Sequence, residues 1–292
     1  LRALANTYGI LPSMLQIKES ATIGPESSPN FETYDEQTNA LNFSNTSSNA
    51  VVVPWNSLPS LPKTLELRFS SVIPSASILA NADNIWALSL VPTTGSYGKV
   101  VLRTPGATIV SSSVFPIFSG DFYSTMVRYE ADGITLHVGR ADGNDIIETS
   151  KTKETGSTIT AVFSAQAALN IGGSGSAFVG AIGYRGLVDE VRVWGESISD
   201  ATFQNHTKYA GLYNGDTTVS ARDSLFVRLS FNKTTNLGVT SSLPNETPYL
   251  QSHPTPTLTS IPTFGFPNIP SAPNNMSVTT RNVTRFTPNA AS

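Results

Sequence analysis

The sequence lacks cysteine and is poor in charge. Without cysteine, neither a disulfide nor a thiolate metal site can form. Only 13% of the residues are charged, and Lys and Arg are scattered without any basic block, so the electrostatic footprint that nucleic acids and anionic membranes require is missing. No apolar run approaches the roughly 20 residues of a membrane-spanning helix. We therefore expect neither a nucleic-acid partner nor a membrane partner.

What the chain does contain is typical of a β-protein outside the cytosol. Apolar residues fill 39% of the 292 positions, which is enough for a core, and Ser with Thr supply about a quarter. Small eukaryotic secreted modules usually depend on disulfides, so the missing cysteines favour a bacterial, archaeal or viral source. The expected location is a virion surface or the extracellular space.

Apolar and polar residues alternate in short runs from residue 38 onward. In 63–69, Leu65, Leu67 and Phe69 share one face, and Ala131-Asp132-Gly133 marks a hairpin. Strands at this spacing predict an all-β fold, a two-sheet antiparallel sandwich. The predicted strands are 40–43, 50–53, 63–69, 78–79, 85–91, 99–103, 108–114, 122–130, 134–140, 145–149, 158–163, 168–171 and 186–194.

One short helix follows the strands. Ser199 is the predicted N-cap, Ile198 and Phe203 occupy the two positions of a hydrophobic staple, and Gly211 ends the helix. A further amphipathic strand is expected at 223–231.

The composition divides the chain into four parts. We expect an N-terminal arm at 1–30, the sandwich at 31–213, a strand and linker at 214–250, and an extended tail at 251–292. The tail is rich in Pro, Thr, Ser and Asn and has no apolar period. We expect both arms to contact other subunits or modules, and the chain to be a piece of a longer multi-module polypeptide.

Four segments follow one another in a fixed order: 39–43 (NALNF), 64–69 (TLELRF), 127–129 (VRY) and 184–194 (YRGLVDEVRVW). Their order resembles a laminin-G-like domain of the concanavalin A-like lectin/glucanase superfamily over about 31–213. The resemblance implies a jelly-roll sandwich and a binding or structural role. Arrays of such domains occur in virion structural proteins of tailed phages, marine ones especially.

The resemblance also implies where catalysis would lie. The glucanases of this superfamily carry Glu-x-Asp-x-x-Glu on one strand, and no such pattern occurs here. Asp189 and Glu190 are adjacent, so a regular strand sends them to opposite faces. His137, His206 and His253 are expected at the surface. We therefore expect no enzymatic activity, with a glycoside hydrolase as the least favoured alternative.

Asp189 is the one candidate metal ligand. It shares its strand phase with Leu187, Val191 and Val193, so it is expected to face the core, where a carboxylate needs partners. Two alternatives are open: backbone N–H donors from a neighbouring loop, or a structural Ca²⁺ ion. Relatives bind calcium near this strand, and the other ligands would come from 43–49.

A glycan site requires aromatic rings beside polar side chains in loops. Asp83, Asn84, Trp86 and Tyr97 form the best such group, and the alternative for Trp86 is a place in the core. The function expected is a structural and binding module of a virion fibre, tail or capsid appendage that binds host-surface carbohydrate. The alternative is a bacterial or archaeal cell-surface adhesin or filament subunit.

Overall fold

In a computed structural model the chain falls into two units, Leu1–Phe31 and Glu32–Ser292, and the residues that the structure describes all lie in the second unit. The predicted arm at 1–30, the predicted strand at 158–163 and His253 lie outside the described residues. The described residues are 40–43, 50–55, 58–82, 85–142, 145–155, 168–173, 177–178, 182–217, 219–231, 243, 245–247 and 257–259.

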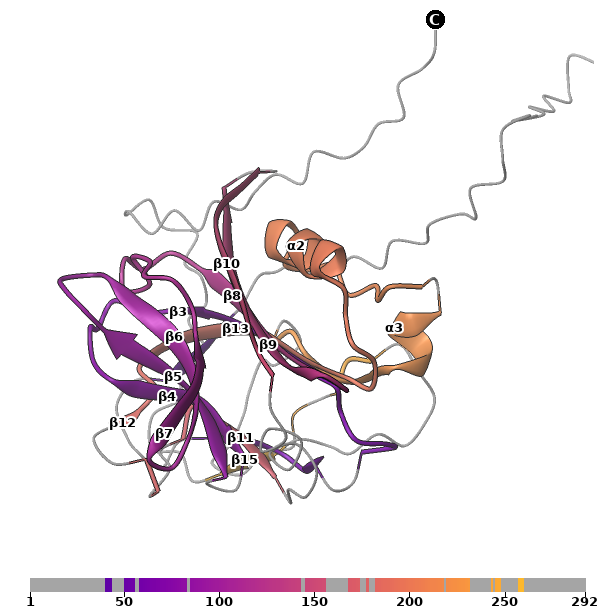
Figure 1. The fold of residues 1–292 in the computed structure, drawn as a ribbon. Coiled ribbons are helices and arrows are strands. Elements are labelled where there is room, and N and C mark those ends of the chain that lie inside the picture. Colours follow the sequence, from indigo (N-terminus) through magenta and orange to yellow (C-terminus); the bar gives the residue numbers. More distant parts are fainter. Residues whose placement is uncertain are drawn as a thin grey trace, which may run out of the picture. The chain divides into compact units, whose positions relative to one another are not determined.

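Two sheets face each other in the described part of the chain (Figure 1). The seven-stranded sheet has the order β1-β13-β3-β8-β9-β10, and β14 shares the outer edge of β13 with β1. Every pairing in this sheet is antiparallel. Its strands are β1 (Leu41–Phe43), β3 (Thr64–Ser70), β8 (Tyr123–Glu130), β9 (Gly133–Asp142), β10 (Asp145–Glu154), β13 (Gly186–Trp194) and β14 (Leu225–Leu229).

The eight-stranded sheet has the order β15-β2-β11-β4-β5-β6-β7. It is antiparallel except where β12 pairs with β4. Its strands are β2 (Ala50–Val53), β4 (Ser77–Ala82), β5 (Trp86–Pro92), β6 (Gly98–Thr104), β7 (Ala107–Ser111), β11 (Leu169–Ile171), β12 (Ile182–Gly183) and β15 (Thr257–Thr259). The predicted all-β jelly-roll sandwich is confirmed.

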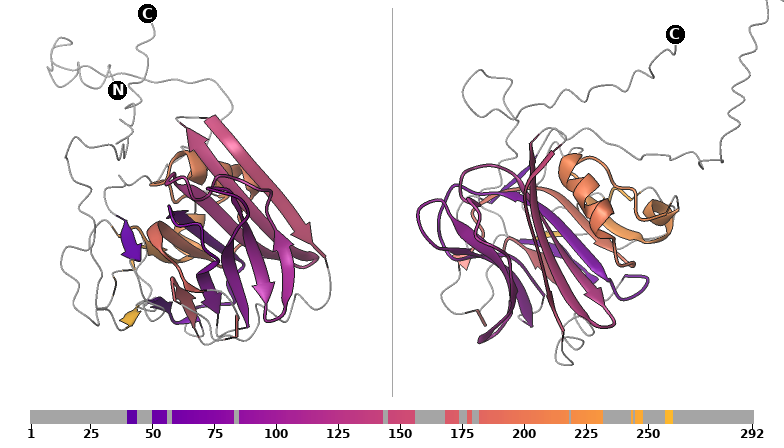
Figure 2. Two further views of the ribbon diagram at one scale, coloured as in Figure 1. Left: turned by 90° about the vertical axis from the view of Figure 1, so that its left-hand side faces the viewer. Right: turned by 45° about the horizontal axis from the view of Figure 1, so that its top comes forward.

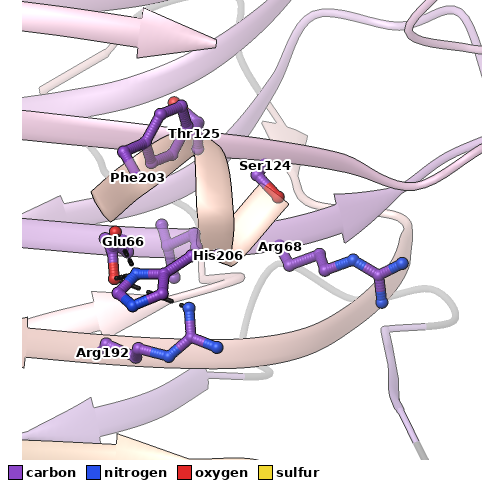
Figure 3. Close-up of a pocket in the computed structure, with 8 residues that line it drawn as sticks. Glu66, Arg68, Ser124, Thr125, Arg192, Phe203 and His206 are labelled. Atoms are coloured by element: carbon purple, nitrogen blue, oxygen red, sulfur yellow. Dashed lines mark hydrogen bonds and ion pairs between the residues drawn. The ribbon is translucent and has the colours of Figure 1, made fainter. Parts of the chain in front are cut away.

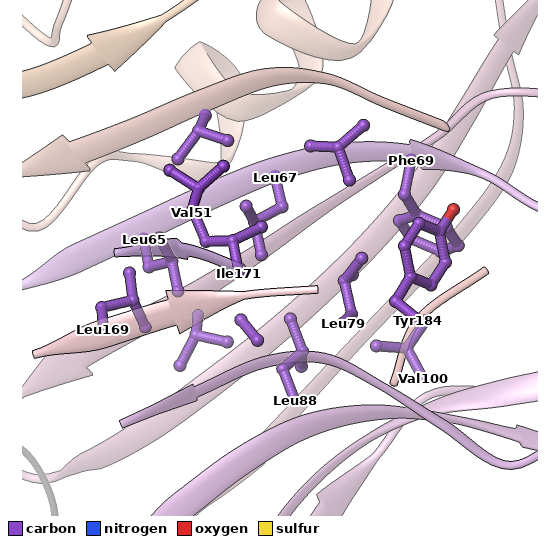
Figure 4. Close-up of a cluster of buried hydrophobic side chains, with 14 of the residues drawn as sticks. Val51, Leu65, Leu67, Phe69, Leu79, Leu88, Val100, Leu169, Ile171 and Tyr184 are labelled. Atoms are coloured by element: carbon purple, nitrogen blue, oxygen red, sulfur yellow. The ribbon is translucent and has the colours of Figure 1, made fainter. Parts of the chain in front are cut away.

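The core lies between the sheets (Figure 4). Leu65, Leu67 and Phe69 of β3 meet side chains of the opposite sheet such as Leu79 and Leu88, and all five are at most 2% exposed. The alternation predicted from the sequence therefore sets the inner face of β3, because successive side chains of a strand point to opposite sides.

Helices α2 (Asp200–Lys208) and α3 (Ser220–Asp223) cover the other face of the seven-stranded sheet (Figure 1 and Figure 2). The Ser199 side chain accepts a hydrogen bond from the N–H of Thr202, as its predicted N-cap role requires. Ile198 and Phe203 pack in one apolar cluster with Trp194 of β13, so the predicted staple also fastens α2 to the sheet.

The sandwich takes in more of the chain than 31–213. β14 lies in the stretch predicted to be strand and linker, and it pairs with β13 through Val191, Arg192 and Val193. β15 comes from the predicted tail and pairs with β2. Neither helix found in the described residues has the length and apolar character needed to cross a bilayer.

Candidate functional site

A layer of charged side chains lies between the seven-stranded sheet and the segment that carries α2 and α3. We call it the polar layer, and all of its members are at most 4% exposed. They come from the outward-facing positions of β3, β13 and β14 and from α2. Its members are Glu66, Asp189, Glu190, Arg192, His206 and Arg228.

Glu66 is held by three donors. Its carboxylate accepts hydrogen bonds from Trp194 Nε1 at 3.0 Å and from His206 Nδ1 at 3.0 Å, and Arg192 Nη1 lies 3.5 Å away. Burial opposes ionisation of Glu66, but the charge and hydrogen bond of His206, with Arg192 and Trp194, outweigh it and lower the pKa to about 2. Glu66 is therefore an ionised anchor for α2.

Glu190 lies between two guanidinium groups. Arg228 Nε donates to its Oε1 at 2.7 Å, and Arg192 Nε lies 3.3 Å from the same oxygen. Burial has the largest effect on the pKa of Glu190 and outweighs the two arginines, which lower it, so that the pKa rises to about 7. The Arg228 guanidinium also stacks over the ring of Tyr213 at 4.0 Å, which ties β14 to the covering segment.

Two histidines are buried, and the prediction that they lie at the surface is wrong. His206 is 2% exposed, and its Nε2 lies 2.9 Å from the carbonyl oxygen of Asn214. His137 is also 2% exposed, lies 4.6 Å from the Phe203 ring, and burial lowers its pKa. His137 faces away from the core as its phase predicts, but α2 covers that face. His206 lies on α2 itself and points at Glu66 of β3.

A β-bulge in β13 overturns the predicted directions of the two adjacent carboxylates. The pairing of β13 with β3 shifts by one residue between Val188 and Val191, and both valines lie in the core. Asp189 and Glu190 therefore lie together on the outer face, where they meet Arg68 and Arg228. The expectation that Asp189 faces the core and Glu190 the opposite side is wrong, because it assumes an unbroken strand.

The partner of Asp189 bears on the expected calcium site. An ion pair with Arg68 neutralises the Asp189 carboxylate, although burial raises its pKa. Calcium takes roughly six to eight oxygen ligands, and the Arg68 guanidinium competes with such an ion for the Asp189 carboxylate. Among the described residues, no group of three or more His, Asp or Glu side chains is placed to hold a metal, and the expected ligands at 44–49 lie outside them. Asp189 is therefore already paired with a cation, and the calcium site stays a prediction.

A small cavity opens beside the polar layer (Figure 3). Its volume is about 10 Å³, which is near the space of one water molecule. The hydroxyl of Thr125 is buried there without a protein hydrogen-bond partner among the described residues. The lining residues are Glu66, Leu67, Arg68, Ser124, Thr125, Arg192, Phe203 and His206.

The burial of the polar layer limits the chemistry that its carboxylates could perform. A retaining glycosidase needs two carboxyl groups about 5 Å apart that face a cleft large enough for a sugar. Glu66, Asp189 and Glu190 are each covered and each paired with a cation, and the adjoining cavity has room only for a molecule the size of water. The layer links side chains of β3, β13 and β14 to one another and, through His206 and Glu66, fastens α2 to the sheet.

Trp86 and Tyr97, the two residues of the predicted glycan set that the structure describes, do not come together. Trp86 is 0% exposed and lies edge-to-face with Trp55 at 6.4 Å, so its ring belongs to the core and has no face for a sugar. Tyr97 follows the far end of β5, about 20 Å away at 3.3 Å per strand residue. Asp83 and Asn84 lie outside the described residues. Of the predicted set, Tyr97 is the member with an exposed ring, at 51%.

Around Tyr97 lies a surface that the sequence did not reveal. The segment 115–122 is hydrogen-bonded to two other loops: Phe118 N–H donates to the carbonyl oxygen of Ser96, and Gly120 N–H donates to that of Ser71. We call the exposed side chains of this region the loop-end surface. They are Val72 (65% exposed), Tyr97 (51%) and Asp121, and the surface also includes the ion-pair partner of Asp121, Arg140, whose side chain is 22% exposed.

The ion pair on this surface is held in place from below. Arg140 Nη1 donates to Asp121 at 2.7 Å, and its Nε donates to Glu148 at 3.1 Å. Glu148 in turn accepts a hydrogen bond of 2.5 Å from the Tyr123 hydroxyl, and burial raises the pKa of Tyr123, so this phenol keeps its proton. The guanidinium therefore has a fixed orientation at a partly exposed site.

Comparisons with known proteins concern the fold. No protein-family model matches this chain, and no curated protein matches it. Among solved structures it is similar to a heptameric SAP-like pentraxin from Limulus polyphemus (16% identity, 59% of this chain and 83% of that one, TM-score 0.45). It is also similar to domains LG4-5 of the mouse laminin alpha1 chain (14%, 53% and 40%, TM-score 0.37). A third is the CBM40 of the Ruminococcus gnavus IT-sialidase, bound to alpha2,3 sialyllactose (11%, 59% and 100%, TM-score 0.40).

Proposed function

We propose that this chain is a non-catalytic binding and structural module on the surface of a virion, in a fibre, tail or capsid appendage. We propose further that the loop-end surface binds a host-surface carbohydrate. The observation that supports carbohydrate binding is the exposed ring of Tyr97 in the same group of loops as the fixed Asp121–Arg140 ion pair. Loops on a rigid sandwich are a common place for binding residues.

The chemistry of this surface suits a sugar. An aromatic face stacks on the apolar side of a pyranose ring, while hydroxyl groups require both acceptors and donors nearby. Asp121 supplies an acceptor, with half of its side chain exposed, and Arg140 supplies donors. Val72 adds apolar surface next to Gly120.

The same surface would also serve a bacterial or archaeal adhesin or filament subunit. Mass spectrometry of the purified source particle separates these alternatives, because it identifies the parent polypeptide and the assembly that contains it. A glycoside hydrolase is less well supported, because the carboxylates of the polar layer are covered and paired.

The binding proposal is tested on a glycan array with the wild-type chain and two variants. Tyr97→Ala should lose roughly two- to ten-fold in affinity for the glycans that the wild type binds, since an aromatic contact contributes roughly 0.5–1.5 kcal/mol. The matched control is Tyr209→Ala, which removes a ring that is 37% exposed at the end of α2. Absence of any glycan binding by the wild type, or equal losses in the two variants, would refute the proposal.

A further inference from the structure

The tail strand β15 occupies an edge that is otherwise open. It pairs antiparallel with β2 in the register Thr257↔Val52, Leu258↔Val51 and Thr259↔Ala50. The opposite edge of β2 is taken by β11. β15 therefore ends the eight-stranded sheet, and without it the backbone N–H and C=O groups along that side of β2 would face outward unpaired.

β2 is a short strand that carries neither a charge nor a bulge to protect a free sheet edge. Its sequence is Ala-Val-Val-Val, without charge, and proline follows only after the strand, at Pro54. The edge strand β10 differs, because it carries Lys151 and Lys153 and has a bulge between Ile146 and Glu148. Charges and bulges are the usual means of keeping an edge from pairing with another chain. The side of β2 that β15 occupies is thus an edge that can accept an added strand.

The added strand has the composition of a segment that exchanges. Pro254, Pro256 and Pro262 surround it, and proline fixes φ near the extended range, which reduces the entropy lost when the segment pairs. Residues 247–280 contain no Asp, Glu, Lys or Arg, so copies of the tail do not repel one another. A strand of three residues forms few backbone hydrogen bonds, each worth roughly 1 kcal/mol net.

We infer that β15 is an exchangeable strand, and that the β2 edge accepts this same segment from a second copy of the chain when copies are crowded together. The strand forms identical backbone bonds in either arrangement, so the local concentration of neighbouring copies decides between them. On an assembly surface, where copies are dense, strand exchange would join neighbouring modules through their tails. The β2 edge is separated from β5, the strand that precedes Tyr97, by β11 and β4 of the same sheet, and the inference is independent of carbohydrate binding.

The absence of cysteine makes the test direct. Val52→Cys and Thr257→Cys are prepared as separate full-length proteins, mixed at high concentration, oxidised and separated under non-reducing conditions. Directly opposed residues of antiparallel strands lie within disulfide range, so exchange produces a heterodimer cross-linked through these two positions. The control mixture pairs Val52→Cys with Leu61→Cys, which places the second thiol at an exposed position outside the strand.

We expect the heterodimer at several times the yield of the control mixture, with the cross-linked peptides identified by mass spectrometry. The pair Ala50→Cys and Thr259→Cys repeats the test at the other end of the register, in case one variant does not fold. A double variant, Val52→Cys with Thr257→Cys in one chain, reports the pairing within a chain. Closure of that internal disulfide with no heterodimer above the control would overturn the inference, and so would failure of every pair to cross-link.

Discussion

Replacement of Glu66 by glutamine tests whether the polar layer holds the helix on the sheet. The substitution keeps the size of the side chain but removes its charge, so Arg192 and His206 lose their counter-ion under α2. The pKa of Glu66 falls from 4.5 to about 2, which at roughly 1.4 kcal/mol per pKa unit corresponds to about 3 kcal/mol. Removal of one partner from a buried ion pair costs roughly 3–5 kcal/mol, which agrees.

The pH dependence of this effect has a definite sign. Because the pKa of Glu66 is depressed in the folded protein, its contribution is fully present above pH 4.5 and is lost as the pH falls toward 2. Glu66→Gln should therefore lower the free energy of unfolding by about 3 kcal/mol at pH 7, and the difference from the wild type should shrink between pH 4.5 and pH 2.

Urea denaturation followed by tryptophan fluorescence measures this difference, since Trp194 donates its indole N–H to Glu66. The matched control is Glu154→Gln, which changes an exposed side chain at the end of β10 and should shift the stability by less than about 0.5 kcal/mol. A loss below about 1 kcal/mol for Glu66→Gln at pH 7 would refute the anchoring role, as would a difference from the wild type that does not change with pH.

Three further predictions concern other features of the sandwich. Gly172→Ala should lower the free energy of unfolding by more than about 2 kcal/mol, because its φ is +84° and a Cβ would collide with the Phe43 ring. The control Gly106→Ala, at φ +85° in open space, should lower it by about 1 kcal/mol, and equal losses in denaturation curves would contradict this prediction. Burial raises the pKa of Glu190 to about 7, so its contribution to the free energy of unfolding is present below pH 4.5 and is lost as the pH rises through 7. Glu190→Gln should therefore make the free energy of unfolding less dependent on pH between 5 and 8, and an unchanged pH dependence in denaturation curves would contradict this. Because Arg68 neutralises Asp189, we expect equal unfolding midpoints in calcium chloride and in a chelator, and a calcium-dependent rise would restore the metal site.

Much of the fold could be predicted because its signals are local. The inner face of β3 follows from the alternation of Leu65, Leu67 and Phe69, which needs no knowledge of the partner sheet. The start of α2 follows from Ser199, whose cap and staple partners lie within five residues of it. The pairing of β15 with β2 gave no such signal, since it joins three residues of a proline-rich tail to a strand about two hundred positions earlier.

Strand alternation alone does not predict the polar layer, because it indicates which face of the sheet a side chain takes and not whether that face is covered. Glu66 and Arg192 stand opposite each other in register, and so do Arg192 and Arg228, so charges line up across three adjacent strands. When each strand is considered by itself, the charged residues at these positions are predicted to be exposed to solvent. A signal does exist: charges of both signs in one row, followed by a helix whose apolar staple needs a surface to pack on, indicate a row that the helix covers. The bulge in β13 then decides which carboxylates join the row, and it brings in Asp189 and Glu190 together.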